Sequence, residues 1–282
     1  MTPPDFAAVL GEPVASAQRI GGGCINEGWR VDLESGERLF VKTRPEVAPG
    51  EYAAEADGLR WLGEPDTVRV PEVRAVADDM LALEWIDEGS LDPAGAEDFG
   101  RGLAALHAAG ADGFGWHAPI RFGRLEISNE PAGETWAEFY AERRLRPLAR
   151  QARDEGSLSP AGSATVEAVC DQIVDLAGPP EPPARLHGDL WGGNVLAGAD
   201  GRAALIDPAA HGGHREVDLA MLRLFGSPGP RVFDAYAEAA PLAAGHEARV
   251  ALWQLFPLLV HAILFGGSYG ASAERTARSL AH

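Results

Sequence analysis

Three polar residues in the last third of the chain have the types and the spacing of a phosphoryl-transfer site. Asp189 is followed five positions later by Asn194, and Asp207 comes directly after the apolar run 203–206. In kinases, the first aspartate accepts the proton of the attacking hydroxyl, and the asparagine and the second aspartate hold magnesium against the nucleotide phosphates. The order predicts Asp189 as the general base and Asn194 and Asp207 as the Mg²⁺ ligands.

Two other interpretations of this segment are open. Gly, Asn and Asp favour tight turns for backbone reasons alone, and a lone His-Gly-Asp would be read as a turn between short strands. The presence of Asn194 and Asp207 in the right order favours catalysis. A zinc site is the second alternative, with His187, His211 and His214 as ligands, but these histidines form no metal-binding spacing such as HxxxH.

A lysine and a glutamate in the N-terminal part could position the phosphates. Lys42 ends the predicted strand 38–42, and Glu55 lies thirteen positions later on a predicted helix that begins near Gly50. A strand lysine that contacts phosphates and is held by a helix glutamate is the kinase arrangement. Glu51 competes for this role because it lies one turn earlier on the same face. Glu55 is favoured because it lies deeper within the helix.

Backbone groups are expected to supply the remaining ATP contacts. The loop that holds Gly22, Gly23 and Cys24 would offer amide groups to phosphates without obstruction by side chains. It lacks the GxGxxG pattern and the Lys and Ser or Thr of a Walker loop, so a P-loop NTPase is disfavoured. Near the end of a later strand, the backbone of Glu84 and Ile86 could face an adenine ring. An exposed Cys24 thiol beside phosphate-binding amides would be open to reversible oxidation, and a loop residue without such a role is the alternative.

The composition limits the partners and the location. The 282-residue chain is 46% hydrophobic and 23% charged, as is usual for a globular protein. A formal charge of −18 argues against nucleic acid as a partner, since its backbone is usually neutralised by clustered Lys and Arg. The longest apolar segment, 250–265, is interrupted by Pro257 and His261 and is shorter than the roughly 18 residues of a membrane span. With no signal-like N-terminus and two cysteines, we expect a cytoplasmic protein without a membrane segment.

The elements that must position these residues fall into two parts. From 14 to 86 short strands alternate with turns and one helix interrupts them, whereas after 89 helical segments dominate, beginning with 94–109. The composition changes at 87–89. We therefore expect an α+β, bilobal, protein-kinase-like fold with a β-rich nucleotide-binding lobe at 1–86 and a mainly helical catalytic and substrate-binding lobe at 87–282.

Several segments together carry a resemblance to a known family. They are HGDLWGGN at 187–194, IDPA at 206–209, GHREVDLAM at 213–221, LAALH at 103–107, and 129–147 with Trp136, Phe139, Tyr140, Arg144 and Leu145. The chain resembles the fructosamine kinase, or ketosamine 3-kinase, family, which is related to aminoglycoside phosphotransferases. Trp191 is the specific part, because aminoglycoside kinases usually lack it. Gly192 departs from the serine that is common in the family, and this change is expected to loosen the loop.

The resemblance implies transfer of the γ-phosphate of ATP, with Mg²⁺, to the 3-hydroxyl of a ketosamine such as a fructosamine or a ribulosamine, as a step in protein deglycation. It implies that Trp191 forms an aromatic wall beside the sugar. It also implies that His187 and Asp218 support the catalytic segment, with Asp218 bonded to its backbone. Glu216 is expected among the acidic groups that favour the protonated amine of the substrate.

Two other functions are open. One is a kinase of the same fold for an aminoglycoside, a choline-like alcohol or another sugar, which an acidic pocket would also attract. The other is a nucleotide-binding module without turnover. Such a module is expected to have lost part of the catalytic set, and Lys42, Asp189, Asn194 and Asp207 are all present.

Overall fold

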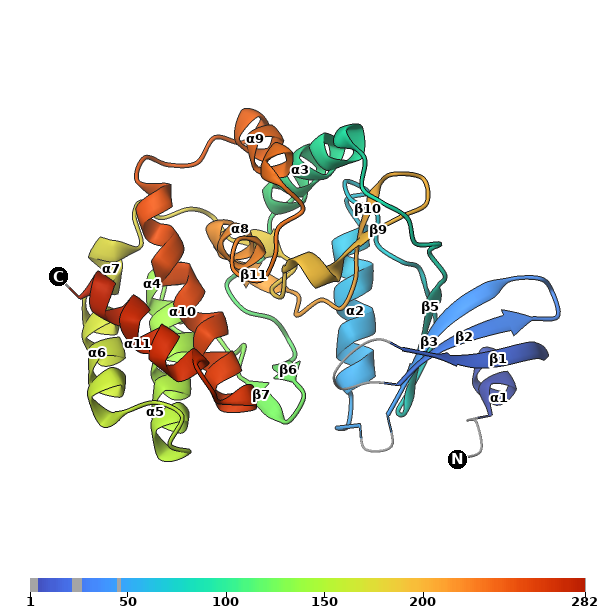
Figure 1. Ribbon diagram of the computed structural model, residues 1–282, viewed down its shortest axis with the longest axis horizontal. Helices are drawn as coiled ribbons and strands as arrows, with labels where there is room; N and C mark the ends of the chain where they lie inside the picture. The colour runs from blue at the N-terminus through green and yellow to red at the C-terminus, as the bar shows by residue number, and fades with distance from the viewer. Residues whose placement is uncertain (1–4, 22–26, 45–46, 282) are drawn as a thin grey trace.

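The computed structural model describes residues 5–21, 27–44 and 47–281. Figure 1 shows an antiparallel sheet at one end of the molecule, a mainly helical part at the other, and the helix α2 between them. This is the predicted α+β, bilobal, protein-kinase-like arrangement. The first part consists of α1 (Phe6–Leu10), β1 (Val14–Ile20), β2 (Glu27–Leu33), β3 (Arg38–Thr43), α2 (Glu51–Gly63), β4 (Val73–Ala77) and β5 (Met80–Glu84).

The second part contains the helices that the sequence predicts after 89, with short hairpins between them. Its elements are α3 (Pro93–Ala108), β6 (Ile120–Phe122), β7 (Leu125–Ile127), α4 (Trp136–Tyr140), a π-helical turn (Ala141–Leu145), α5 (Arg146–Asp154), α6 (Pro160–Asp171), α7 (Ile173–Leu176), β8 (Ala184–Leu186), a 3₁₀ turn (Gly192–Asn194), β9 (Val195–Ala197), β10 (Ala203–Leu205), β11 (His211–Gly213), α8 (Glu216–Leu222), α9 (Pro230–Ala239), α10 (His246–Phe265) and α11 (Tyr269–Leu280).

The N-terminal sheet has the strand order β1-β2-β3-β5-β4, and each neighbouring pair is antiparallel. Successive side chains of a strand point to opposite faces. On β5, Met80 packs with the cluster around Phe6 of α1, whereas Leu81 packs with Tyr52 of α2. Lys42 of β3 is directly opposite Leu81 in the register. Strand alternation therefore points Lys42 toward α2.

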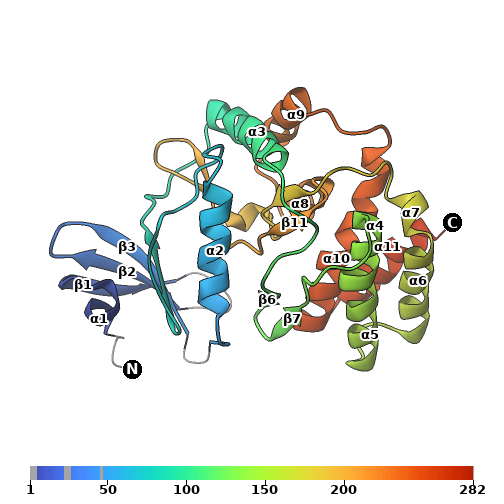
Figure 2. The same ribbon diagram turned by 180° about the vertical axis from the view of Figure 1, so that it is seen from behind.

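The starts of α3 and α4 in the second part follow local capping rules. The side chain of Asp92 accepts a hydrogen bond from the Gly95 amide at 2.7 Å, and Pro93 occupies the first turn of α3. Thr135 and Glu138 form a reciprocal capping box at the start of α4. In Figure 2, α3 lies beside α9 at the top of the molecule, and the two helices share a core that includes Leu205 of β10.

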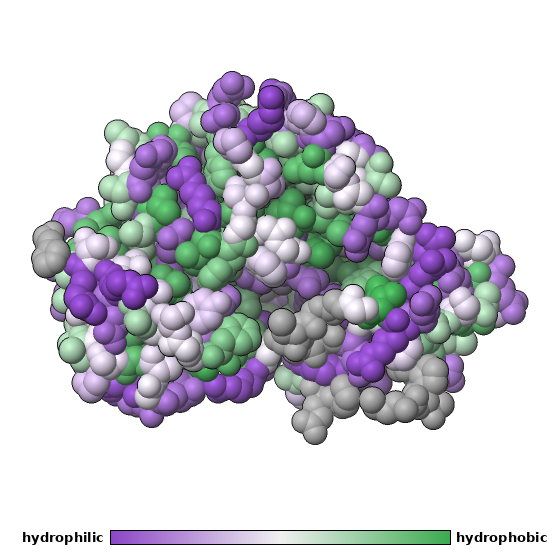
Figure 3. Space-filling model, viewed as in Figure 1, coloured by the Kyte–Doolittle hydropathy of each residue, from purple (hydrophilic) through white to green (hydrophobic). Residues whose placement is uncertain are grey.

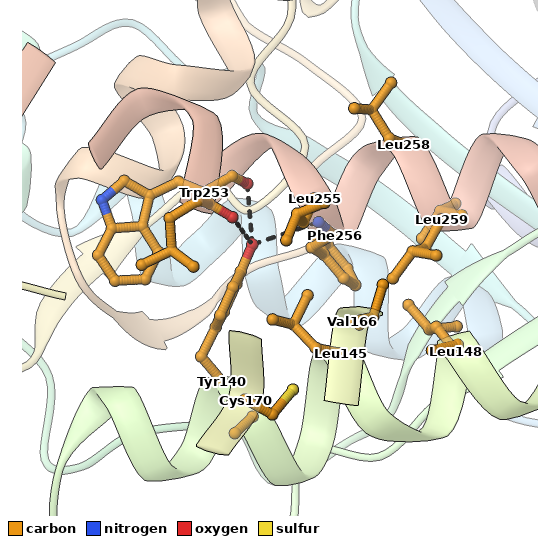
Figure 4. Packing of buried hydrophobic residues seen from close by; sticks show 14 of the residues in the cluster. Tyr140, Leu145, Leu148, Val166, Cys170, Trp253, Leu255, Phe256, Leu258 and Leu259 are labelled. Carbon is orange, nitrogen blue, oxygen red and sulfur yellow. Dashed lines mark hydrogen bonds between the residues drawn. The ribbon is translucent and has the colours of Figure 1, made fainter. Parts of the chain in front are cut away.

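The long helix α10 forms the centre of the C-terminal core, where it packs against α5, α8 and α11. It runs through Pro257 without a break. Proline has no amide hydrogen, which would leave the carbonyl of Trp253 without its helical partner. The hydroxyl of Tyr140 donates to that carbonyl at 2.9 Å, as Figure 4 shows. Tyr140 therefore replaces the hydrogen bond that Pro257 removes.

By length and composition α10 could also cross a membrane, but most of it is buried inside the protein. Buried residues on several of its faces are expected of a helix in the core of a large domain. A mostly buried helix of this kind gives only weak evidence of a membrane span.

Candidate active site

A cleft of about 860 Å³ lies between the two parts of the molecule and brings the predicted catalytic residues together. Figure 3 shows this face hollowed between its two halves, with apolar surface reaching into the hollow. Of the predicted site residues, those that line the cleft are Lys42, Glu84, Ile86, Asp189, Trp191, Asn194 and Asp207. They come from β3, from the end of β5, and from the segments around β9 and β10.

The segment that carries Asp189 is a loop and a 3₁₀ turn between β8 and β9. The side-chain amide of Asn194 donates to Oδ2 of Asp189 at 3.0 Å and to its backbone carbonyl at 2.9 Å. Asp189 also accepts the Trp191 amide through its backbone carbonyl. These contacts hold the carboxylate of Asp189 beside the side chain of Asn194, as the kinase pattern requires.

Asp218 on α8 holds the backbone that precedes Asp189. Its fully buried carboxylate accepts hydrogen bonds from the amides of His187 at 2.8 Å and Gly188 at 2.9 Å. The imidazole of His107 on α3 approaches the same carboxylate at 3.3 Å. This is the arrangement that the resemblance implied for Asp218. His187 contributes through Nε2, which lies 2.9 Å from the carbonyl of Ile206.

The backbone conformation and the close packing at position 188 require a glycine. Its φ of 80° lies in the left-handed region, and a Cβ at this position would come within 2.1 Å of the carbonyl oxygen of Ala209. A side chain here would displace the segment 206–209 or the catalytic loop. At Gly193 a Cβ would lie 2.2 Å from the ring of Trp191, so a side chain there would require the ring to move.

Lys42 joins the sheet, α2 and the segment after β10. Its ammonium group lies 2.6 Å from the carboxylate of Glu55 and forms a second ion pair with Asp207. Glu51 points elsewhere and pairs with Arg44 at 2.5 Å. Between the two glutamates that the sequence left as candidates, the geometry places Glu55 at Lys42.

Asp207 directs its carboxylate into the cleft from a backbone conformation that is uncommon for a residue with a side chain. Its φ is 55°, in the left-handed region that Asp and Asn tolerate better than most residues. The side chain is 46% exposed even though it is paired with Lys42. One oxygen thus meets the lysine, while the group stays accessible from the cleft.

The environment changes the ionisation of the two principal side chains. The pKa of Asp189 is raised to about 7, chiefly by burial; the hydrogen bond from Asn194 acts to lower it, and the carboxylates of Asp207 and Asp218 act to raise it. Burial acts to lower the pKa of Lys42, but the charges of Glu55 and Asp207 outweigh it and leave this pKa raised. Lys42 is therefore a fixed cation in the cleft.

The donor groups at the phosphate end fit magnesium. Asp207 offers an accessible carboxylate, and the amide oxygen of Asn194 has no hydrogen-bond partner among the residues that the structure describes. Oxygen ligands of this kind suit Mg²⁺. The zinc alternative has no support, since within the described chain no three His, Cys, Asp or Glu side chains are grouped to hold a metal ion.

The nucleotide side of the cleft is apolar and ends at β5. Its lining includes Phe40, Leu83 and Leu196, together with Glu84 and Ile86. The side chain of Glu84 turns to Arg69, and its amide donates to the carbonyl of Glu72 at 2.8 Å, so neither group is left to contact a base. No partner for the amide of Ile86 is found in the part of the chain that the structure describes. Gly22, Gly23 and Cys24 lie outside the described residues.

The acceptor side differs from expectation at one residue. Trp191 lines the cleft and is 38% exposed, as an aromatic wall would be. Glu216, expected to face the amine of the substrate, is buried. Its two oxygens accept hydrogen bonds from the guanidinium of Arg249 at 2.6 and 2.9 Å, and from the indole of Trp253. The expected contact of Glu216 with the substrate amine is therefore wrong. This carboxylate instead joins α8 to α10 through Arg249 and Trp253.

Sequence reasoning missed two groups of residues around the site. His107 was part of a matched motif, but no role was assigned to it. A buried histidine inside a helix with an apolar face could have been read as the partner of a buried acid. The aromatic residues of α10 and α11 that line the cleft gave no separate signal, since apolar residues at helical spacing most often belong to a core.

Comparison with known proteins identifies the family to which the chain is similar. The family model for fructosamine kinase matches residues 5–282. A probable ketoamine kinase from Thermus thermophilus is 37% identical over 259 residues, which cover 92% of this chain and 91% of that protein. The chloroplastic protein-ribulosamine 3-kinase of Arabidopsis thaliana is 33% identical over 264 residues, with coverage of 90% and 79%.

Solved structures agree with this placement. A crystal structure from Thermobifida fusca, of a protein with the provisional name fructosamine-3-kinase, has a TM-score of 0.90 and 50% identity, and the match covers 97% of this chain and 96% of that one. An aminoglycoside phosphotransferase shares the fold alone, with a TM-score of 0.63, 17% identity and coverage of 95% and 94%. The family model and the identity to its relatives over almost the whole length show that the chain belongs to the fructosamine kinase family.

Proposed function

We propose that the protein transfers the γ-phosphate of ATP to a sugar hydroxyl of a ketosamine, the 3-hydroxyl by analogy with the ribulosamine 3-kinase relative. The observation that carries this proposal is the convergence of Asp189, Asn194 and Asp207 with the Lys42–Glu55 pair in one cleft, beside the exposed ring of Trp191. The first set supports phosphoryl transfer, and the tryptophan supports a sugar as the acceptor.

Each residue has a defined task in this reaction. Asp189 accepts the proton of the attacking hydroxyl, and Asn194 fixes the orientation of its carboxylate. Lys42 supplies a positive charge to the phosphates, and Glu55 holds it in position. Mg²⁺ held by Asn194 and Asp207 would neutralise charge on the phosphate oxygens. The proton passes from the sugar hydroxyl to Asp189, the new O–P bond forms, and the bond to ADP breaks.

Two rivals receive less support from the site. A polycationic aminoglycoside would need acidic groups on the acceptor side, and Glu216, the acid expected there, is neutralised by Arg249. A nucleotide-binding module without turnover would have no need for the hydrogen bonds that orient Asp189. A cytoplasmic location remains part of the proposal and rests on the composition alone.

The test measures ADP release from ATP and Mg²⁺ with ribulosamines, fructosamines, kanamycin-type aminoglycosides and choline as acceptors. We expect the highest kcat/KM for a ketosamine. In the Asp189→Asn variant, turnover should fall by about 10²- to 10⁴-fold while ATP binding is kept, since the proton acceptor is lost. A higher kcat/KM for an aminoglycoside or choline would overturn the substrate assignment. Near-normal turnover in folded Asp189→Asn would overturn the mechanism.

A further inference from the structure

The acceptor side of the cleft has an apolar wall formed by β6, α8, α10, α11 and the residue Phe225. We call this surface the acceptor wall. Its members are Phe122, Val217, Met221, Phe225, Trp253, Phe256, Pro257, Val260, His261, Leu264, Phe265 and Tyr269. Among these described residues there is no Asp, Glu, Lys or Arg. The wall therefore carries none of the net charge of −18.

Four rings at the outer end of this wall are packed together. The ring centroids of Phe225 and His261 are 4.3 Å apart, and those of His261 and Tyr269 are 5.0 Å apart. Phe265 extends the group at 5.3 Å from His261, and it is 56% exposed. An exposed phenylalanine that continues a pocket wall offers contact area to a ligand, whereas isolated apolar surface residues are common and mean little.

The histidine of the wall is held as a neutral ring. Nδ1 of His261 lies 2.8 Å from the carbonyl of Pro257, to which it can only donate. Burial lowers the pKa of His261 more than this contact raises it. Nε2 has no partner among the described residues, so it remains an acceptor that could take one N–H of the substrate. The wall thus offers no negative charge.

The acidic group that contacts Trp253 of the wall is neutralised. The side chain of Glu216 is 4% exposed, forms the ion pair with Arg249 and accepts the indole N–H of Trp253. A second cationic group on a substrate would lose water at this wall without gaining a counter-ion, which is unfavourable. An apolar group would gain from leaving water, and aromatic groups would also gain from ring contacts.

We propose that the acceptor wall binds the group carried by the amine of the ketosamine, and that this group is apolar, aliphatic or aromatic, without a second charge. The inference rests on the proposed function, because it assigns the part of the same substrate that lies beyond the sugar. The wall belongs to the same cleft as Asp189 and Trp191, so a substrate with its sugar beside Trp191 reaches it directly. A ketosamine of a simple alkylamine or arylalkylamine is the class of substrate that fits.

The decisive experiment uses pairs of fructosamines and ribulosamines of matched length. Ketosamines made from pentylamine and from 1,4-diaminobutane differ only in a terminal methyl or ammonium group. We expect kcat/KM to be at least about tenfold higher for the pentyl compound. Along the series from methylamine to pentylamine it should rise by up to about fourfold for each methylene that enters the wall.

Variants of Phe265 test whether the acceptor wall causes this substrate preference. Phe265→Ala should lower kcat/KM more for the pentyl and benzyl ketosamines than for the methylamine compound, and Phe265→Glu should shift the preference toward the diaminobutane compound. Because Phe265 is more than half exposed, both variants are expected to fold. Val174→Ala is the control, since Val174 is an exposed apolar residue, 65% accessible, that does not line the cleft. It should leave all ratios unchanged.

The outcomes separate the inference from the function on which it rests. Equal or higher kcat/KM for the diaminobutane ketosamine would overturn the inference and leave the kinase assignment intact. The inference would also be overturned if Phe265→Ala changed kcat/KM by the same factor for every ketosamine. If no ketosamine were phosphorylated while another alcohol was, the proposed function would fail and the inference with it.

Discussion

Lys42 and Asp207 are 165 positions apart in the chain, yet their side chains form an ion pair across the cleft. The pair connects β3 of the sheet to the segment after β10. Asp207 is also the carboxylate assigned to magnesium, so the lysine and the metal would share one acidic group. Its exposed portion faces the cleft, which allows both contacts.

The first prediction concerns this shared carboxylate. Asp207→Ala should weaken binding of ATP in the presence of magnesium by about tenfold or more, because a metal ligand and a partner of Lys42 are both removed. Isothermal titration of ATP with and without Mg²⁺ measures the effect. Asp200→Ala is the matched control, since Asp200 is similarly exposed and lies outside the cleft lining. An ATP affinity that responds neither to the metal nor to Asp207→Ala would contradict the assignment.

The second prediction separates the two glutamates of α2. Glu55→Gln removes the charge that lies 2.6 Å from Lys42 and should lower kcat/KM for ATP by about tenfold or more, as expected for a lost hydrogen bond between charged groups. Glu51→Gln makes the same chemical change one turn away, where the partner is Arg44. It should change kcat/KM less than twofold. Equal losses in the two variants would show that the effect is a general one on α2.

The third prediction concerns Asp218 and pH. Burial opposes ionisation of Asp218, but hydrogen bonds and charges, led by the bond with His107, leave its pKa below the ordinary value of 3.8. A folded-state pKa that is lowered stabilises the protein above the ordinary pKa, and this contribution is lost as the pH falls through the folded-state value. Asp218→Asn should therefore be less stable at pH 7 and pH 5, by about 1 to 3 kcal/mol.

The deficit of Asp218→Asn should shrink below pH 4, because the wild-type carboxyl takes up a proton near pH 3.8 in the unfolded protein and at a lower pH in the folded protein. Urea unfolding at pH 7, 5, 4 and 3 measures it. A deficit that stays constant down to pH 3 would mean that the charge of Asp218 contributes nothing to stability.

The fourth prediction tests the repair of α10. Tyr140→Phe removes the hydroxyl that donates to the Trp253 carbonyl and leaves that buried group without its partner. We expect a loss of about 1 to 3 kcal/mol in the free energy of unfolding. Tyr269→Phe is the control, because its hydroxyl has no hydrogen-bond partner among the described residues. If the two variants lose the same stability, the contact of Tyr140 with Trp253 is not what compensates for Pro257.

Much of the fold and the phosphate end of the site could be predicted from the sequence, for a physical reason. The strand that ends at Lys42 and the helix that carries Glu55 are encoded in local patterns, and kinase chemistry fixes the order of Asp189, Asn194 and Asp207. These features depend on residue type and spacing. Neighbours along the chain are enough to specify them.

The acceptor side could not be predicted in the same way. Glu216 is charged and close in sequence to the catalytic segment, which favoured a role at the substrate, but its partner Arg249 is 33 positions away and is brought to it by the packing of α10 on α8. The hydrogen bond that Pro257 removes from α10 is likewise replaced by a residue of another helix, Tyr140. Tertiary contacts of this kind leave no mark in local sequence patterns.

Gly188 and Phe265 differ in how freely each position can accept another residue. A Cβ at Gly188 would lie 2.1 Å from a carbonyl oxygen, so we expect a side chain at this position to disturb the catalytic loop whichever acceptor is used. The acceptor wall has no comparable confinement at Phe265, whose side chain is largely in solvent. Changes of substrate among relatives should therefore accumulate on α10 and α11, and directed evolution toward new amines would best begin with libraries at those helices.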